Sequence, residues 1–242
     1  MLPEIDNNLI YPKLSKKELP VKYNSVSVIN IKNPLEYKLS KEVCDTVLQT
    51  YEYNCLYYIN KSPKSFYYNI LNYDVNFAKY LSEQLSTFLP AQLTLGPKSR
   101  CDWQSDNSEE YNVWNLEGIS PYFNLIKVTP GHRIMPHYDE VIKCPSDPLI
   151  RTLYSGVIQL TDNSSGFTAF LDDGQQDVDR KSRILANWDN EPNDEDIIEW
   201  SKPNKGDIIV YPHEMCKSIT PVLKQDLIFL QFGIYYSAFT KR

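Results

Sequence analysis

The stretch PYFNLIKVTPGHRIMPHYDEV, residues Pro121–Val141, decides the fold class of this 242-residue chain. Its first half reads as a strand, and the Pro130–Gly131 pair that follows is typical of a turn. Beyond the turn, His137 and Asp139 stand two residues apart, and residues two apart on a strand point to the same face of a sheet. The stretch therefore predicts two strands around a turn, with an imidazole and a carboxylate side by side on the second.

An imidazole and a carboxylate on one face are two of the three ligands that hold Fe(II) in non-haem oxygenases. The chain contains three histidines, so only His132 and His213 remain as a third ligand. His132 directly follows the turn and is interpreted as a solvated turn residue. The alternative interpretation of His137 and Asp139, a surface-loop pair that binds no metal, stays open.

The rest of the chain divides into a helical first third and a strand-rich remainder. Ser40 is placed to cap a helix that runs to about residue 53, and Asp74 begins a second helix that Pro90 stops. Strands are expected at residues 26–31, 55–59, 65–70, 122–129, 153–161, 167–171, 207–211, 217–223 and 227–235. Many short strands after a helical third predict an α+β, mainly β fold, in which helices pack on one side of a sandwich or barrel.

Three polar segments are predicted to lie outside the core. Residues 1–25 are expected to form an arm on the surface, residues 96–119 a loop or lid, and the acidic residues 189–199 a solvated loop. We expect residues 1–120 to pack as arm, helices and strands on a core formed by residues 121–242, the two parts making one continuous domain.

Composition narrows the classes of partner. The net charge of −6 argues against a general binder of nucleic-acid phosphates. No window approaches the ~20 apolar residues of a membrane helix, so no membrane partner is expected. The five cysteines are odd in number and lack metal-knuckle spacing, which predicts reduced thiols and a cytoplasmic location.

From Pro121 to the C terminus, about half of the chain, the sequence resembles the prolyl 4-hydroxylase branch of the Fe(II)/2-oxoglutarate dioxygenases. Five pieces match in the family's order: VTPGHRIMPHYDEV (128–141), LIRTLYSGVIQLTD (149–162), SSGFTAFLDD (164–173), KPNKGDIIVYP (202–212) and SITPV (218–222). The resemblance implies a double-stranded β-helix, a jelly-roll or cupin-like fold, with helices that support one sheet.

The same resemblance implies a site and a reaction. Fe(II) would be held by His137, Asp139 and His213, and 2-oxoglutarate would be the co-substrate, with ascorbate as a further candidate cofactor. Lys224, eleven residues after His213, or Arg151 would bind the far carboxylate of 2-oxoglutarate through a charge-assisted hydrogen bond. The implied function is hydroxylation of a prolyl residue or of another amino-acid, peptide or small-molecule substrate.

Three positions depart from the family's pattern. Lys217 stands in the slot of the distal histidine, Leu227 in the slot of the basic 2-oxoglutarate anchor, and Val128 where a tyrosine often precedes the turn. A protonated lysine is a poor iron ligand, because its lone pair carries a proton and its reference pKa is ~10.4.

The departures motivate an alternative function, a catalytically degenerate dioxygenase fold that serves as a binding or accessory module. In it, Lys217 occupies the metal position and pairs with Asp139. A third hypothesis is a different β-sandwich module in which the His-x-Asp pair is incidental.

Overall fold

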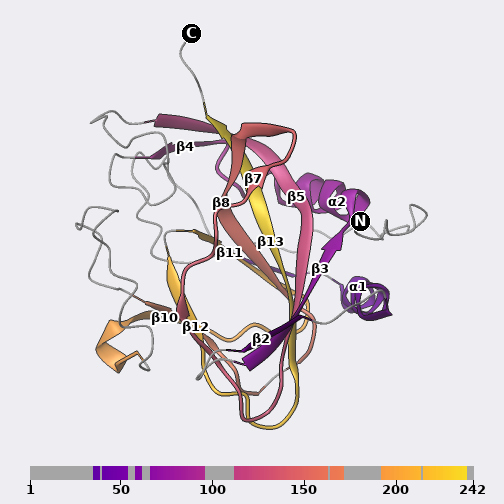
Figure 1. The fold of residues 1–242 in the computed structure, drawn as a ribbon, viewed down its shortest axis with the longest axis vertical. Coiled ribbons are helices and arrows are strands. Elements are labelled where there is room, and N and C mark those ends of the chain that lie inside the picture. Colours follow the sequence, from indigo (N-terminus) through magenta and orange to yellow (C-terminus); the bar gives the residue numbers. More distant parts are fainter. Residues whose placement is uncertain are drawn as a thin grey trace.

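The computed structural model of the chain describes residues 35–38, 40–53, 58–61, 66–95, 112–162, 164–171, 192–213 and 215–238. Within these ranges, two antiparallel sheets lie against one another, and two helices pack on the outer side of the larger sheet (Figure 1). This arrangement confirms the predicted α+β, mainly β fold, a double-stranded β-helix with N-terminal supporting helices.

The larger sheet has nine strands in the order β1-β11-β8-β13-β5-β3-β2, with β4 added to β5 and β7 added to β8. Their bounds are β1 Leu35–Lys38, β2 Tyr58–Lys61, β3 Phe66–Tyr73, β4 Gln92–Leu95, β5 Asn112–Val128, β7 Lys143–Cys144, β8 Asp147–Gln159, β11 Asp207–Pro212 and β13 Leu227–Ala238. The central strand β13 is almost continuously apolar because both of its faces are covered, which is the pattern of a fully buried strand.

The smaller sheet has four strands in the order β10-β9-β12-β6. Their bounds are β6 Ile134–His137, β9 Thr168–Leu171, β10 Ile197–Ser201 and β12 Cys216–Ile219. The turn before β6 needs a glycine, since Gly131 adopts a φ of 84°. Its backbone N–H donates to the Val222 carbonyl oxygen at 2.8 Å, which ties the turn to the segment that follows β12.

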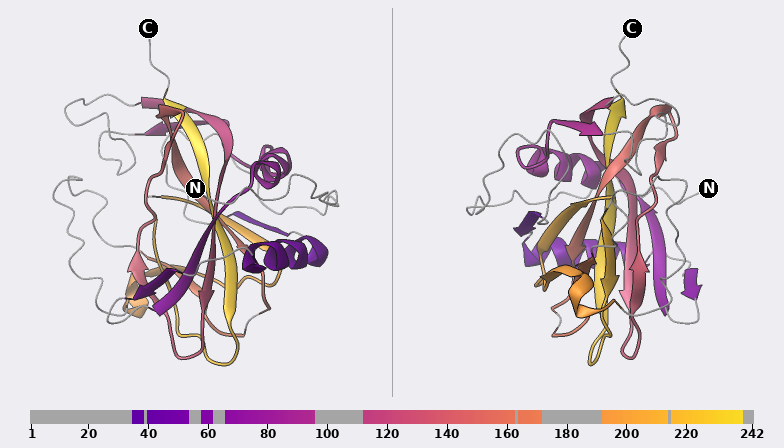
Figure 2. Two further views of the ribbon diagram at one scale, coloured as in Figure 1. Left: turned by 45° about the vertical axis from the view of Figure 1, so that its right-hand side comes forward. Right: turned by 90° about the vertical axis from the view of Figure 1, so that its left-hand side faces the viewer.

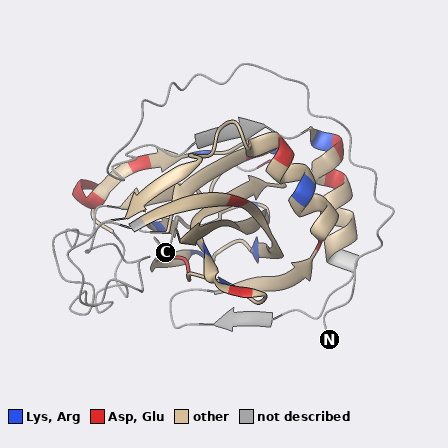
Figure 3. Cartoon of the chain, turned by 90° about the horizontal axis from the view of Figure 1, so that it is seen from above, with Lys and Arg blue, Asp and Glu red and all other residues tan. Residues whose placement is uncertain are grey.

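Both helices begin where the sequence predicts. Helix α1 (Lys41–Tyr53) follows Ser40, whose hydroxyl accepts from the Val43 N–H at 3.2 Å. Helix α2 (Val75–Leu85) follows Asp74, whose carboxylate accepts from the Phe77 N–H at 2.8 Å. Figure 2 shows the two helices on one side of the sheets, and the view from above shows charged residues on them (Figure 3).

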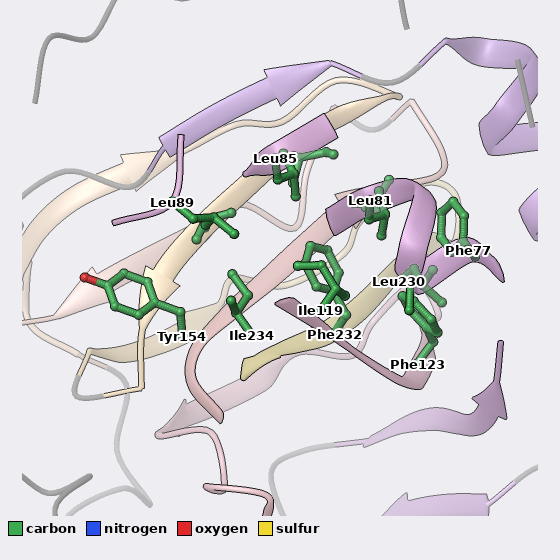
Figure 4. Packing of buried hydrophobic residues seen from close by; sticks show 14 of the residues in the cluster. Phe77, Leu81, Leu85, Leu89, Ile119, Phe123, Tyr154, Leu230, Phe232 and Ile234 are labelled. Atoms are coloured by element: carbon green, nitrogen blue, oxygen red, sulfur yellow. The ribbon is translucent and has the colours of Figure 1, made fainter. Parts of the chain in front are cut away.

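The main core lies between α2 and the larger sheet. Phe77 and Leu81 of α2 are fully buried and pack near Phe123 of β5 and Leu230 of β13 (Figure 4). Burial of one such side chain contributes about 1.5–3 kcal/mol, so this face accounts for a large part of the stability of the helix. The core thus sits on the outer side of the sheet and leaves the side that faces the smaller sheet for the site.

Several local predictions need correction. The expected loop at residues 96–119 is wrong from residue 112 onward, because β5 begins at Asn112 and buries Trp114 completely. The described part of the expected loop at residues 189–199 contains the short 3₁₀ helix η1 (Asp194–Asp196) and the start of strand β10, since Ile197–Ser201 pairs with β9. Residues 96–111 and 189–191 of these two loop predictions lie outside the described residues. Both strands lie in segments rich in polar residues, and that polarity had favoured loops.

Other boundaries shift or fall outside the description. Strand β12 ends at Ile219, short of the predicted residue 223, because the segment turns toward Pro221. Helix α2 ends at Leu85, before Pro90 is reached. The predicted arm at 1–25 and strand at 26–31 lie outside the described residues, and β5 runs through the expected junction at residues 120 and 121. None of the described helices is long and apolar enough to cross a membrane.

Candidate functional site

A cavity of about 350 Å³ lies between the two sheets. Strands β3, β5, β8, β11 and β13 line it from the larger sheet, and β6, β9 and β12 line it from the smaller one. His137, Asp139, His213 and Lys217 are all among its lining residues. The structure thus brings these four side chains to one cavity.

The His-x-Asp pair faces the cavity, although not on one continuous strand. Strand β6 ends at His137, so Asp139 lies in the segment after it, yet His137 Nε2 is 3.9 Å from Asp139 Oδ1. His137 Nδ1 is 2.9 Å from the Met135 carbonyl oxygen, which can only accept, so Nδ1 carries the proton and Nε2 is the nitrogen that faces Asp139. Burial and the neighbouring Lys217 lower the pKa of His137 from 6.5 to about 4, which keeps the imidazole neutral.

Lys217 occupies the place opposite this pair. Strand β12 pairs Lys217 directly with His137 on β6, and its ammonium lies 2.5 Å from Asp139 Oδ1. Both side chains are buried, with exposures of 6 % and 8 %. The ammonium also lies 4.8 Å from the centre of the Tyr211 ring, within the range of a cation–π contact. The structure therefore contains the ion pair of the alternative hypothesis.

The carboxylate of Asp139 has a second donor. Gln231 of β13 donates from Nε2 to the same Oδ1 at 2.7 Å. Burial alone would raise the pKa of Asp139, but the adjacent Lys217 ammonium outweighs it and holds that pKa well below its usual range. The negative charge that results, together with burial, raises the pKa of the nearby Tyr211 hydroxyl. Asp139 is thus a buried, ionised carboxylate whose charge is balanced by one lysine.

His213 lines the same cavity. It follows β11, is buried, and its Nε2 lies 2.9 Å from the Ser155 hydroxyl on β8. It is also near enough to Asp139 to help lower the pKa of that carboxyl, after Lys217. Among the residues that the structure describes, no three His, Cys, Asp or Glu side chains are arranged to hold a metal ion together, so the three-ligand assignment stays a prediction.

The two candidate anchors for 2-oxoglutarate do not line the cavity. Arg151 is buried on β8 with its guanidinium 4.6 Å from the centre of the Trp114 ring. Lys224 is exposed in the turn between β12 and β13. The lining residue at the family's anchor position is Leu227, and Lys217 is the one lysine or arginine among the described lining residues.

Sequence reasoning missed two members of the site. Gln231 donates a hydrogen bond to Asp139, and the ring of Tyr211 makes a cation–π contact with the Lys217 ammonium. Gln231 could have been found, because it is the single polar residue in the apolar run LIFLQFGIYY. Tyr211 carries no such signal, since tyrosine is common in this chain.

Comparison with known proteins bears on the fold. No family model and no curated protein matches the sequence. Among solved structures, the viral collagen prolyl hydroxylase of Paramecium bursaria Chlorella virus-1, in its 2-oxoglutarate complex, is similar at 17 % identity, a TM-score of 0.50, and coverage of 86 % of this chain and 98 % of that chain. This chain has the fold of a prolyl hydroxylase-like 2-oxoglutarate oxygenase. A Pseudomonas putida prolyl-4-hydroxylase also matches, at 13 % identity and a TM-score of 0.46, over 84 % of this chain and 92 % of that chain.

The oxygenase fold implies Fe(II) and 2-oxoglutarate, but the residues of the site do not fit either group as they stand. The position opposite His137 carries the Lys217 ammonium, which occupies Oδ1 of Asp139 and repels a second cation. The family's anchor position for the far carboxylate of 2-oxoglutarate is Leu227, which carries no charge. The one lysine among the described lining residues, Lys217, already pairs with Asp139, so a bound dianion would lack a cationic partner.

Proposed function

We propose that this oxygenase-fold protein is a binding or accessory module that holds a peptide or small molecule in its central cavity without a metal ion. The ion pair between Lys217 and Asp139 carries this proposal. It places a protein cation where the fold family holds a metal cation. The cavity, about 350 Å³ in volume, has the size of a small-molecule site.

Metal binding at this site would be costly. A metal ion that binds Asp139 must either displace the Lys217 ammonium from Oδ1 or bind Oδ2 beside that ammonium. Either position leaves two cations close together away from bulk water, where their repulsion is strong. A lysine at this position therefore favours a metal-independent role.

A second candidate is a 2-oxoglutarate-dependent oxygenase that hydroxylates a prolyl or other amino-acid, peptide or small-molecule substrate. The approach of His137 and Asp139 inside the cavity of an oxygenase fold favours it. It requires Lys217 to leave Asp139 and His213 to turn away from Ser155. Both movements break contacts between buried side chains, so this candidate is second.

Anaerobic titration with Fe(II) and Mn(II), followed by calorimetry with and without 2-oxoglutarate, separates the two candidates. We expect no stoichiometric binding by the native protein and a gain of binding in Lys217→His, which places an imidazole opposite His137. The matched control is Lys127→His, because Lys127 is also a strand lysine in an ion pair, with Asp226 at 2.8 Å, but lies outside the cavity. Stoichiometric binding by the native protein that His213→Ala abolishes would overturn the proposal and establish the oxygenase.

A further inference from the structure

The charges inside the cavity cancel one another. Lys217 is the one lysine or arginine among the described lining residues, and Asp139 neutralises it at 2.5 Å. The second lining carboxylate, Glu140, is exposed. A carboxylate ligand would therefore enter a space that holds no unpaired lysine or arginine among the described residues, and moving an uncompensated charge out of water is strongly unfavourable. The charge balance favours an uncharged ligand.

A row of carboxamide side chains crosses the wall formed by the larger sheet. Asn124 on β5 lies directly opposite Gln231 on β13, and both line the cavity. Asn69 on β3 pairs with Ile126, two residues along β5 from Asn124, and also lines the cavity. Directly opposite side chains have Cβ atoms about 5 Å apart, and diagonal ones about 7–8 Å apart. Asn69, Asn124 and Gln231 therefore form one amide row that ends at Asp139.

The amide row has hydrogen-bonding capacity to offer a ligand. The Asn69 side-chain oxygen is buried and makes no hydrogen bond to any residue that the structure describes. A carboxamide presents both donors and an acceptor, which match the donor and acceptor of another amide. Apolar and aromatic side chains, Tyr67, Tyr122 and Phe229 among them, line the space beside the row and would cover the rest of a ligand.

We propose that the cavity takes an uncharged, amide-bearing small molecule along this row, and that Asp139 excludes carboxylates by masking the charge of Lys217. This inference rests on the metal-independent site proposed above. Asp139 then acts as a specificity-determining residue rather than as a ligand for a metal. Substitution of Asp139 by an uncharged residue would leave the Lys217 ammonium without its carboxylate partner. The cavity would then prefer carboxylate ligands to uncharged ones.

Two probes that share an N-acetylalanine core and differ in the C-terminal group test the proposal. N-acetylalanine methylamide is uncharged and amide-bearing, and N-acetylalanine replaces one amide by a carboxylate. In a nuclear magnetic resonance titration of the full chain, the uncharged probe should shift the side-chain amide signals of Asn69, Asn124 and Gln231. The carboxylate probe should bind about a hundredfold more weakly or not at all. Equal or tighter binding of the carboxylate, or no response of the amide row to either probe, would overturn the proposal.

Substitutions of single residues test which side chains determine the binding of the two probes. Asn124→Leu should weaken the uncharged probe about tenfold through the loss of a buried amide partner. Asn115→Leu is the control, because Asn115 lies on the same strand outside the cavity. Asp139→Asn should tighten N-acetylalanine at least tenfold, and the double variant Asp139→Asn with Lys217→Met should not.

Different results would refute the proposed metal-independent function and the inference about ligand charge. Stoichiometric metal binding by the native protein would refute the metal-independent function on which this inference depends. Absence of metal binding together with a preference for the carboxylate probe would refute only the inference about ligand charge. The probe comparison uses the native protein, so it gives a result even where Asp139→Asn does not fold.

Discussion

The Lys217 ammonium lies 2.5 Å from Oδ1 of Asp139, and strand β12 holds this lysine directly opposite His137 on β6. A buried lysine and a buried carboxylate thereby make direct contact at the cavity. The pair connects the smaller sheet to the segment after β6, and Gln231 connects it to the larger sheet. The site is thus also a junction between the two sheets.

Removal of the lysine should destabilise the protein strongly. Lys217→Met leaves the Asp139 carboxylate buried without its cation, and loss of one partner of a buried ion pair costs about 3–5 kcal/mol. Urea denaturation at neutral pH measures this loss. Lys127→Met is the control, because its pair with Asp226 is about one-third exposed and should contribute about 0–1 kcal/mol. Similar losses in the two variants would contradict a buried ion pair.

Stability should fall as the pH is lowered from neutral. The pKa of His137 is lowered from 6.5 to about 4 in the folded protein, so the unfolded chain binds more protons between these values. The stability contributed by the neutral imidazole is therefore present above pH 6.5 and lost as the pH falls toward 4. The depressed pKa of Asp139 adds a further loss below about pH 4, the ordinary value for aspartate. Denaturation midpoints across this range measure both steps.

The variant His137→Gln separates the two steps. Glutamine does not titrate, so the loss between pH 6.5 and 4 should shrink while the loss below pH 4 remains. An unchanged profile in the variant would assign the first step to another group.

The sequence predicts much of this fold because its local signals agree. Asp74 caps α2, and the Pro130–Gly131 turn connects β5 to β6 as expected. The missed strands, β10 and the first part of β5, lie in sequence rich in polar residues, and pairing with β9 and β4 decides their structure. Local propensity cannot supply that information, since a strand partner is distant in the chain.

The site is predicted less completely for the same reason. The short spacing between His137 and Asp139 places both at the cavity, and the family pattern singles out Lys217. The contact between Lys217 and Asp139 joins residues 78 positions apart, so sequence could offer it only as one alternative. The contact of His213 with Ser155, 58 positions away, is likewise one that no local pattern predicts.

A side chain at Gly156 should disrupt the centre of the larger sheet. Gly156 on β8 lies opposite Phe232 on β13, and an added Cβ atom would lie 2.0 Å from Cζ of that ring. Gly156→Ala should therefore cost about 1–3 kcal/mol through overpacking, measured by thermal or urea denaturation. Phe232→Leu in the same chain should recover part of the loss. A further loss in the double variant would show that the ring does not cause the clash.

The amide of Gln231 should stabilise the charged form of Asp139. Gln231→Leu removes the 2.7 Å hydrogen bond to Oδ1, and a hydrogen bond to a charged group contributes about 1.5–3 kcal/mol. Gln231→Glu keeps the size of the side chain but places a second carboxylate beside the first, so the loss at neutral pH should be larger. Because like charges raise each other's pKa, protonation of one carboxylate relieves the repulsion, so the extra loss in Gln231→Glu should shrink as the pH is lowered. Denaturation midpoints between pH 3 and 8 for the native protein and both variants measure these effects. Equal losses in the two variants at every pH would show that Gln231 acts on packing alone.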